Sequence, residues 1–172
     1  MLLAQDLADT MLIATFDYII PTSPLVALAN AISTYIVDNA EIAFTWEAVN
    51  TIPPNDTESI ATTGEIITCP IVFTPSMAIV PQIGLTYLML ELVAGIKLGT
   101  FNITAGGWST TAQLMSDCPA FTLYIDGTGD RDSAFLQMAT QIVNQIKAYS
   151  PGTPIPGTHG TYSGASTSAI IS

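Results

Sequence analysis

Hydrophobic residues recur every three to four positions at the start of the chain, as in an amphipathic helix. Within residues 2–20 this stripe is formed by Leu3, Leu7, Met11 and Ala14, and it predicts a first helix. Ser23-Pro24 marks a restart, because serine can accept a hydrogen bond from an early helical amide and proline fits the first helical position. A second helix is predicted over 24–38, with one face made of Leu25, Leu28, Ile32, Tyr35 and Ile36. The chain is therefore expected to open with a helical hairpin.

From Glu41 the hydrophobic period changes towards two, which is typical of a strand with one solvated face. Ile42, Phe44 and Trp46 alternate with polar or small residues and predict the first strand. Residues 51–57 are expected to form a loop because of their prolines and Asn-Asp pair, and residues 59–73, broken at Pro70, one or two further strands.

The middle of the chain has a less regular pattern. Residues 84–98 predict a helix, and residues 101–108 a polar, glycine-rich connection. Residues 109–117 could begin another helix, whereas 121–125 have the composition of an extended segment.

The last third predicts a helix over 133–149, with its N-terminus capped by the acidic turn 126–132. A linker rich in proline, glycine and threonine follows at 151–160, and then a terminal strand at 161–171.

Two segments of the chain resemble each other. Ser59 to Thr68 returns 104 residues later as Ser163 to Ser172, and helical residues upstream match at an offset of 110. A fixed period with one short deletion is typical of a duplicated supersecondary unit. The alternative is chance similarity among serine, threonine, alanine and isoleucine.

The repeat predicts an α+β fold of two tandem pseudo-repeats, in which an amphipathic helix or helix pair precedes short antiparallel strands. The expected units are 1–76 and a degenerate copy at 77–172, which carries an arm at 150–160 and the terminal strand. We expect the two units to form one compact body.

Charge narrows the classes of partner. Fourteen acidic residues oppose three bases, so the net charge is -11, and only 10% of residues are charged against about 25% in ordinary soluble domains. Polyanion binding requires clustered lysine and arginine, so nucleic acid and anionic membranes are disfavoured as partners. A surface with few charges favours contact with other proteins.

Targeting and redox features are sparse. Asp6 and Asp9 interrupt the N-terminal apolar stretch, so no signal peptide is predicted, and no apolar stretch fits a membrane-spanning helix. We expect Cys69 and Cys118 to be unpaired, although two thiols allow one disulfide.

No motif for catalysis, metal or cofactor binding stands out. A Ser-His-acid triad needs a well-positioned histidine, and the chain has only His159, in a glycine- and proline-rich loop. In a calcium loop that begins at Asp126, the sixth position would be glycine and the twelfth glutamate. This chain has Arg131 and Gln137 at those positions. We therefore expect a non-enzymatic protein without metal or cofactor.

Candidate interface residues are aromatic, because aromatic side chains contribute large contact areas at low entropic cost. Burial of Trp46 beneath its own strand is an equally good interpretation. The candidate set, which includes the lone histidine, is Trp46, Phe101, Trp108, His159 and Tyr162.

The run Leu28-Ala-Asn-Ala-Ile-Ser-Thr-Tyr-Ile36, followed by Ala40-Glu-Ile and Thr62-Thr-Gly-Glu-Ile66, resembles small structural proteins of tailed bacteriophage particles. In several of these an alanine-rich amphipathic helix leads into threonine- and glycine-rich strands. The resemblance covers the two repeated units and leaves out residues 73–120.

This resemblance implies a non-enzymatic virion component at the tail, baseplate or neck, or a cement protein on the capsid. It further implies synthesis in the host cytoplasm and oligomeric contacts with other virion proteins or copies of itself. Two other classes fit parts of the composition: an extracellular adhesin or carbohydrate-binding module with a groove lined by Trp46 and Trp108, and a small hydrolase that uses carboxylates.

Overall fold

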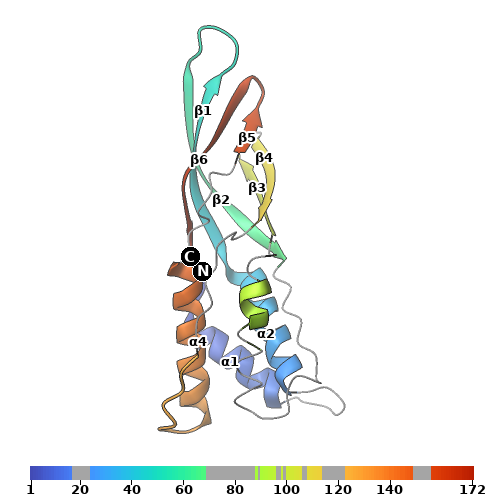
Figure 1. The fold of residues 1–172 in the computed structure, drawn as a ribbon, viewed down its shortest axis with the longest axis vertical. Helices are drawn as coiled ribbons and strands as arrows, with labels where there is room; N and C mark the ends of the chain where they lie inside the picture. The colour runs from blue at the N-terminus through green and yellow to red at the C-terminus, as the bar shows by residue number, and fades with distance from the viewer. Residues whose placement is uncertain are drawn as a thin grey trace.

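The structure is a computed structural model, in which helices occupy one end of an elongated molecule and a sheet the other (Figure 1). The described residues are 1–16, 24–68, 88, 90–95, 98, 100–105, 108–113, 123–148 and 156–172. The helices are α1 (Ala4–Phe16), α2 (Pro24–Asn39) and α4 (Arg131–Ala148), and residues 88, 90–95 and 98 are also helical. The α+β class predicted from the sequence is confirmed.

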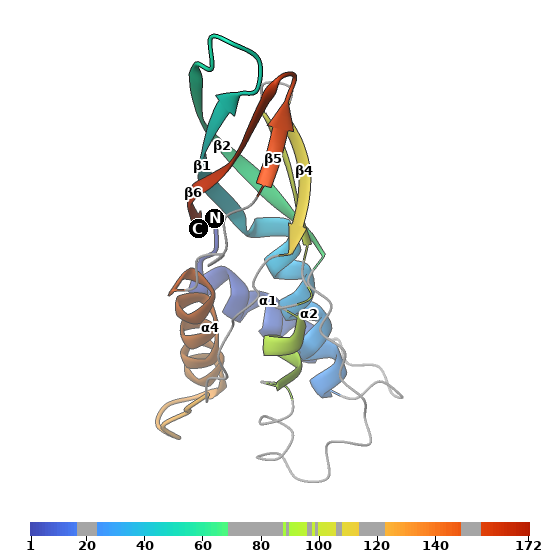
Figure 2. The ribbon, with the colours of Figure 1, turned by 45° about the horizontal axis from the view of Figure 1, so that its top comes forward.

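The six strands in the described part of the chain form one antiparallel sheet in the order β4-β3-β2-β1-β6-β5. Their bounds are β1 Glu41–Asn50, β2 Thr57–Thr68, β3 Thr100–Ala105, β4 Trp108–Gln113, β5 Pro156–His159 and β6 Tyr162–Ile171. The sheet curls so that β4 and β5, the first and last strands of this order, lie next to each other (Figure 2).

The helices bury most of the described core. On α2, Leu28, Ile32 and Ile36 are buried, as the sequence predicted. On α4 the buried face begins at Met138 and ends at Ile146. Each large aliphatic side chain that is fully buried stabilises the fold by about 1.5–3 kcal/mol, so the helical end supplies the main apolar stabilisation of the described chain.

The first helix differs from its prediction in its start and in one face residue. It begins at Ala4 instead of residue 2 and is described as far as Phe16, whereas the predicted residues 17–20 lie outside the described part. Leu7 and Met11 are buried as expected, but Leu2 takes the buried position predicted for Leu3, which is exposed. The physical reason is that residues 1–3 precede the helix, where the helical period does not apply. The backbone of Leu3 is instead fixed by the Tyr35 hydroxyl, which accepts from Leu3 N (2.8 Å) and donates to Leu3 O (2.9 Å).

One prediction for the middle of the chain was wrong, and one alternative that the pattern left open is not realised in the described residues. The expected connection 101–108 is mostly strand β3, and residues 109–113, where a helix was an option, lie in β4. The sequence contains the reason, because Phe101, Ile103 and Thr110-Thr111 favour strands. The predicted extended run 121–125 forms no strand in its described part, 123–125.

The C-terminal third agrees closely with its predictions. α4 begins two residues before the predicted start, and β6 matches the predicted terminal strand. Asp130 caps α4, because its Oδ1 accepts from Ser133 N (2.9 Å) and from Ser133 Oγ (2.8 Å). The prediction of an arm at 150–160 is wrong for residues 156–159, because these residues form strand β5 and pair with β6.

The order helix, strand, strand occurs twice, as α2-β1-β2 and α4-β5-β6. The two matched segments flank β1 on either side, with Ser59 opposite Glu47 and Ser163 opposite Val49. However, β1 has ten residues and β5 only four, and both predicted units share one sheet. The tandem pseudo-repeat therefore stays a prediction.

Candidate interaction surface at the distal tip

Two turns meet at the end of the molecule farthest from the helices (Figure 1). One joins β1 to β2, and the other is the two-residue turn Gly160-Thr161 between β5 and β6. We call residues 49–57 and 160–162 the distal tip. Thr51 links the turns, because its backbone N (2.8 Å) and its Oγ1 (2.7 Å) both donate to Thr161 O. The tip is thus one surface built from two parts of the chain that are far apart in sequence.

The local sequence explains the shape of the β1–β2 turn. Asn50 Oδ1 accepts from Ile52 N (3.0 Å), which is the asparagine turn that competes with continued strand. Asn55 has φ 59°, a left-handed conformation that asparagine tolerates better than most residues. Gly160 has φ 56° at the first turn position, as a two-residue hairpin turn of type II′ requires.

Asp56 ties the two turns together through its carboxylate. Oδ1 accepts from Asn50 Nδ2 (2.9 Å), and Oδ2 accepts from the Tyr162 hydroxyl (2.8 Å). Asn50 N also donates to Asp56 O (2.8 Å). Hydrogen bonds to a carboxylate are stronger than those between neutral groups, so this network defines the relative position of β6 and the turn.

The same contacts shift two pKa values in opposite directions. The Tyr162 hydrogen bond, followed by that from Asn50, lowers the pKa of Asp56 from its usual 3.8. The hydrogen bond to Asp56 raises the pKa of Tyr162 above 10.0. At neutral pH the pair is therefore a carboxylate and a neutral phenol, so Tyr162 acts as a donor and is poorly suited to act as a nucleophile.

The outer surface of the tip presents apolar side chains on turns whose shape is fixed by hydrogen bonds. Ile52 is 56% exposed and Val49 is 50% exposed, and Pro53 and Pro54 beside them are also exposed. Proline lacks a backbone donor and has little conformational freedom to lose. Exposed apolar residues on a pre-ordered loop are typical of a protein contact surface.

The structure places all five predicted interface residues in the sheet, but only Tyr162 within the distal tip, with His159 directly beside it at the end of β5. These two form an antiparallel pair where β5 ends and β6 begins. Trp46 lies within β1, opposite Ile60 and Ser166. Phe101 and Trp108 belong to the β3–β4 hairpin. The side chains of Trp46, Phe101, Trp108 and His159 lie outside the described part.

Apart from Tyr162, which was a predicted interface residue, sequence reasoning missed the residues that shape the tip. The prolines of residues 51–57 predict a loop. The isoleucine within this loop was the available signal for an exposed contact surface. The pairing of Asp56 with Tyr162 spans 106 residues, so local patterns could not reveal it.

The described residues contain no group of three or more histidine, cysteine, aspartate or glutamate side chains that could hold a metal ion. Within the same residues, no helix has the length and apolar character needed to cross a bilayer. Comparison with known protein families, with curated proteins and with solved structures found no match to this chain.

Proposed function

We propose that this chain is a non-enzymatic structural component of a bacteriophage virion, located at the tail, baseplate or neck, or on the capsid as cement. The distal tip carries the proposal, because it presents exposed apolar side chains on turns that hydrogen bonds hold in place, at the end of an elongated molecule. A rigid projecting loop loses little entropy when a partner covers it. Contact with other polypeptides is the task that this geometry suits best.

The distribution of charge supports the same function. The hairpin formed by β1, β2 and their turn contains five acidic residues and no base: Glu41, Glu47, Asp56, Glu58 and Glu65. A hairpin of this composition disfavours nucleic acid and anionic lipid as partners but is compatible with protein partners. Partners are therefore other virion proteins or copies of the same chain, assembled after synthesis in the host cytoplasm.

The pseudo-repeat would add a second reason for an assembly role. Two similar helix-and-hairpin units in one chain would offer two similar contact surfaces. Such a chain could bridge neighbouring subunits or rings of differing symmetry.

Particle composition tests this proposal directly. Phage particles released from a host that carries this gene are purified on a density gradient, and their proteins are identified and quantified by mass spectrometry. We expect the chain in a fixed ratio to the capsid or tail proteins, and genes for portal, sheath, hub or capsid proteins beside its own. Absence from washed particles would refute the virion assignment.

A further inference from the structure

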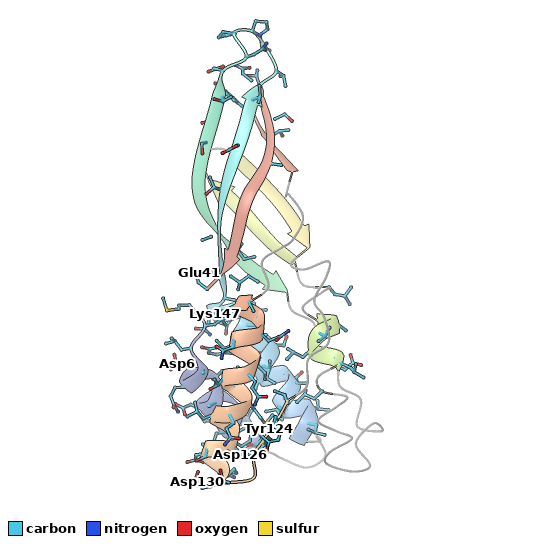
Figure 3. All side chains as sticks on the ribbon, turned by 60° about the vertical axis from the view of Figure 1, so that its left-hand side comes forward. Asp6, Glu41, Tyr124, Asp126, Asp130 and Lys147 are labelled. Atoms are coloured by element: carbon cyan, nitrogen blue, oxygen red, sulfur yellow. The ribbon has the colours of Figure 1, made fainter. Side chains whose placement is uncertain are left out.

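One side of β2 is left open beside the distal tip. β1 pairs with all of residues 57–65, whereas β3 pairs with β2 only from Gly64 onward. Among the described strands, none pairs with residues 57–63 on the side away from β1. Figure 3 shows this part of β2 at the border of the sheet, next to the β1–β2 turn. We call residues 57–63 the β2 edge.

The pairing with β1 determines which backbone groups of the β2 edge point outward. Asn50 N donates to Asp56 O (2.8 Å), and the register between β1 and β2 is unbroken from there onward. Hydrogen-bonded and non-hydrogen-bonded pairs alternate in an antiparallel ladder, so the even-numbered residues of the edge bond to β1. The odd-numbered residues direct their N–H and C=O groups away from β1: Thr57, Ser59, Ala61 and Thr63.

The other borders of the described sheet lack the charge found here. β4 and β5 end the strand order, but they lie next to each other where the sheet curls. β6 extends beyond β5, but residues 163–171 contain no charged residue. In the β2 edge, by contrast, Glu58 lies between Asp56 and Glu65, and residues 56–65 include no base. An open backbone and negative charge therefore coincide at this edge.

The charge around the β2 edge indicates the sign of its partner. Glu47 on β1 is exposed and lies opposite Ser59. Hydrogen bonds lower the pKa of Asp56, so this carboxylate stays charged near neutral pH. A second copy of the chain would bring the same acids to the edge and be repelled, whereas a strand with lysine or arginine would be attracted. Charge complementarity therefore favours a basic partner.

We propose that the β2 edge binds an extended basic segment of another polypeptide as an additional strand. This rests on the proposed assembly function and names the chemistry of one partner. The outward backbone groups supply affinity, and the basic side chains of the segment supply selectivity. An added strand also covers an edge that would otherwise invite non-specific pairing. Because Thr57 belongs to both, the edge and the distal tip form one continuous contact surface.

A short synthetic peptide tests this proposal on the purified full-length chain. Lysine alternates with threonine or valine along the peptide, and both of its ends are blocked. Amide hydrogen exchange is measured by NMR with and without the peptide. We expect slower exchange at Ser59 and Ala61, whose N–H groups gain an acceptor, and no change at Ile60 and Thr62, which bond to β1. This alternation distinguishes an added strand from general attraction to an acidic protein.

Two control peptides separate the contribution of the backbone from that of charge. Glutamate in place of lysine should weaken binding by roughly tenfold or more, because like charges then meet. N-methylation of all backbone amides removes every peptide donor, so it should abolish the slower exchange at the β2 edge. Equal protection by the N-methylated peptide would contradict pairing through the backbone.

Proline substitutions locate the binding site on the chain. Ala61→Pro removes one outward N–H, a change that edge strands tolerate. Ala169→Pro is the matched control, because Ala169 lies opposite Phe44 on β6 and its N–H is also directed away from β1. We expect Ala61→Pro to weaken peptide binding by roughly tenfold or more and Ala169→Pro to leave it unchanged. Circular dichroism checks that both variants fold; if Ala61→Pro does not, the peptide comparison on the wild-type chain decides.

Three results would overturn the added basic strand. They are an absence of alternating protection at the β2 edge, equal loss of binding in the two proline variants, and the same protection in the concentrated chain without peptide. The last would show that a second copy occupies the edge. If the chain is found in particles but the peptide does not bind, the strand contact is refuted while the virion assignment stands. If the peptide binds as expected but the chain is absent from particles, only the virion assignment fails.

Discussion

The helical end and the distal tip are each stabilised by a different kind of interaction. The helical end has a buried core in which Leu7, Ile32 and Ile142 are fully buried. The distal tip has exposed residues that are positioned by hydrogen bonds between two turns. Apolar burial gives the helical end its stability, whereas the tip gains a defined shape with little stability of its own. The difference indicates that the helical end supports the structure and the tip makes contact.

The largest effect is expected from a cavity in the helical core. Ile32→Ala removes buried methyl and methylene groups and should lower the free energy of unfolding by about 2–5 kcal/mol. The exposed Ile13→Ala should change it by less than about 0.5 kcal/mol. Chemical denaturation of both variants checks this, and equal midpoints would show that α2 does not carry the core.

The next effect is expected where the sheet is most tightly packed. Gly164 in β6 faces β1, and a Cβ there would collide with the Glu47 carbonyl oxygen and would lie 2.5 Å from Ala48 Cα. Gly164→Ala should therefore destabilise the chain by about 1–3 kcal/mol, the usual cost of overpacking.

Gly160→Ala is the matched control for Gly164→Ala. It meets open space but keeps a left-handed φ of 56°, so it should cost about 1–2 kcal/mol. Thermal unfolding of both variants checks whether Gly164→Ala lowers the melting temperature more than Gly160→Ala does. A fully tolerated Gly164→Ala would contradict the close approach of β6 to β1.

A smaller and local effect is expected at the tip. Tyr162→Phe removes the hydroxyl that binds Asp56 and leaves the helical core untouched. We expect faster amide hydrogen exchange at Thr51 and Asn50 with the melting temperature almost unchanged. A large drop in melting temperature would mean that the tip contributes to global stability, contrary to the contrast between the two ends.

The smallest effect on the stability of the folded chain is expected from a change in pH. The pKa of Asp56 is lower in the folded chain than its usual 3.8. Its contribution to the stability of the folded state is therefore complete above pH 3.8 and is lost as pH falls through the lowered value. The folded pKa of Tyr162 is raised, so its contribution is complete below 10.0 and is lost as pH rises through the raised value. An NMR titration of the Asp56 carboxyl carbon checks this. In Tyr162→Phe the midpoint should move back towards 3.8, and an unchanged midpoint would contradict the hydrogen bond as the cause.

Local patterns predicted the helical end far better than the tip. The spacing of Leu28, Ile32 and Ile36 is a local signal, and α2 follows it closely. The β3–β4 hairpin was missed because a glycine pair between short runs was assigned to a polar connection. The Asp56–Tyr162 contact depends on strand pairing between distant parts of the chain, so no local pattern could indicate it.

Hydroxyl-radical footprinting tests the central claim, that the distal tip is covered by another polypeptide. The chain is labelled as a dilute monomer and again in its assembled state, in the particle or in its oligomer, and the oxidation of Ile52 is compared with that of Ile13. The account predicts that Ile52 becomes protected on assembly while Ile13 keeps its reactivity. Unchanged oxidation of Ile52 in the assembled state would contradict it.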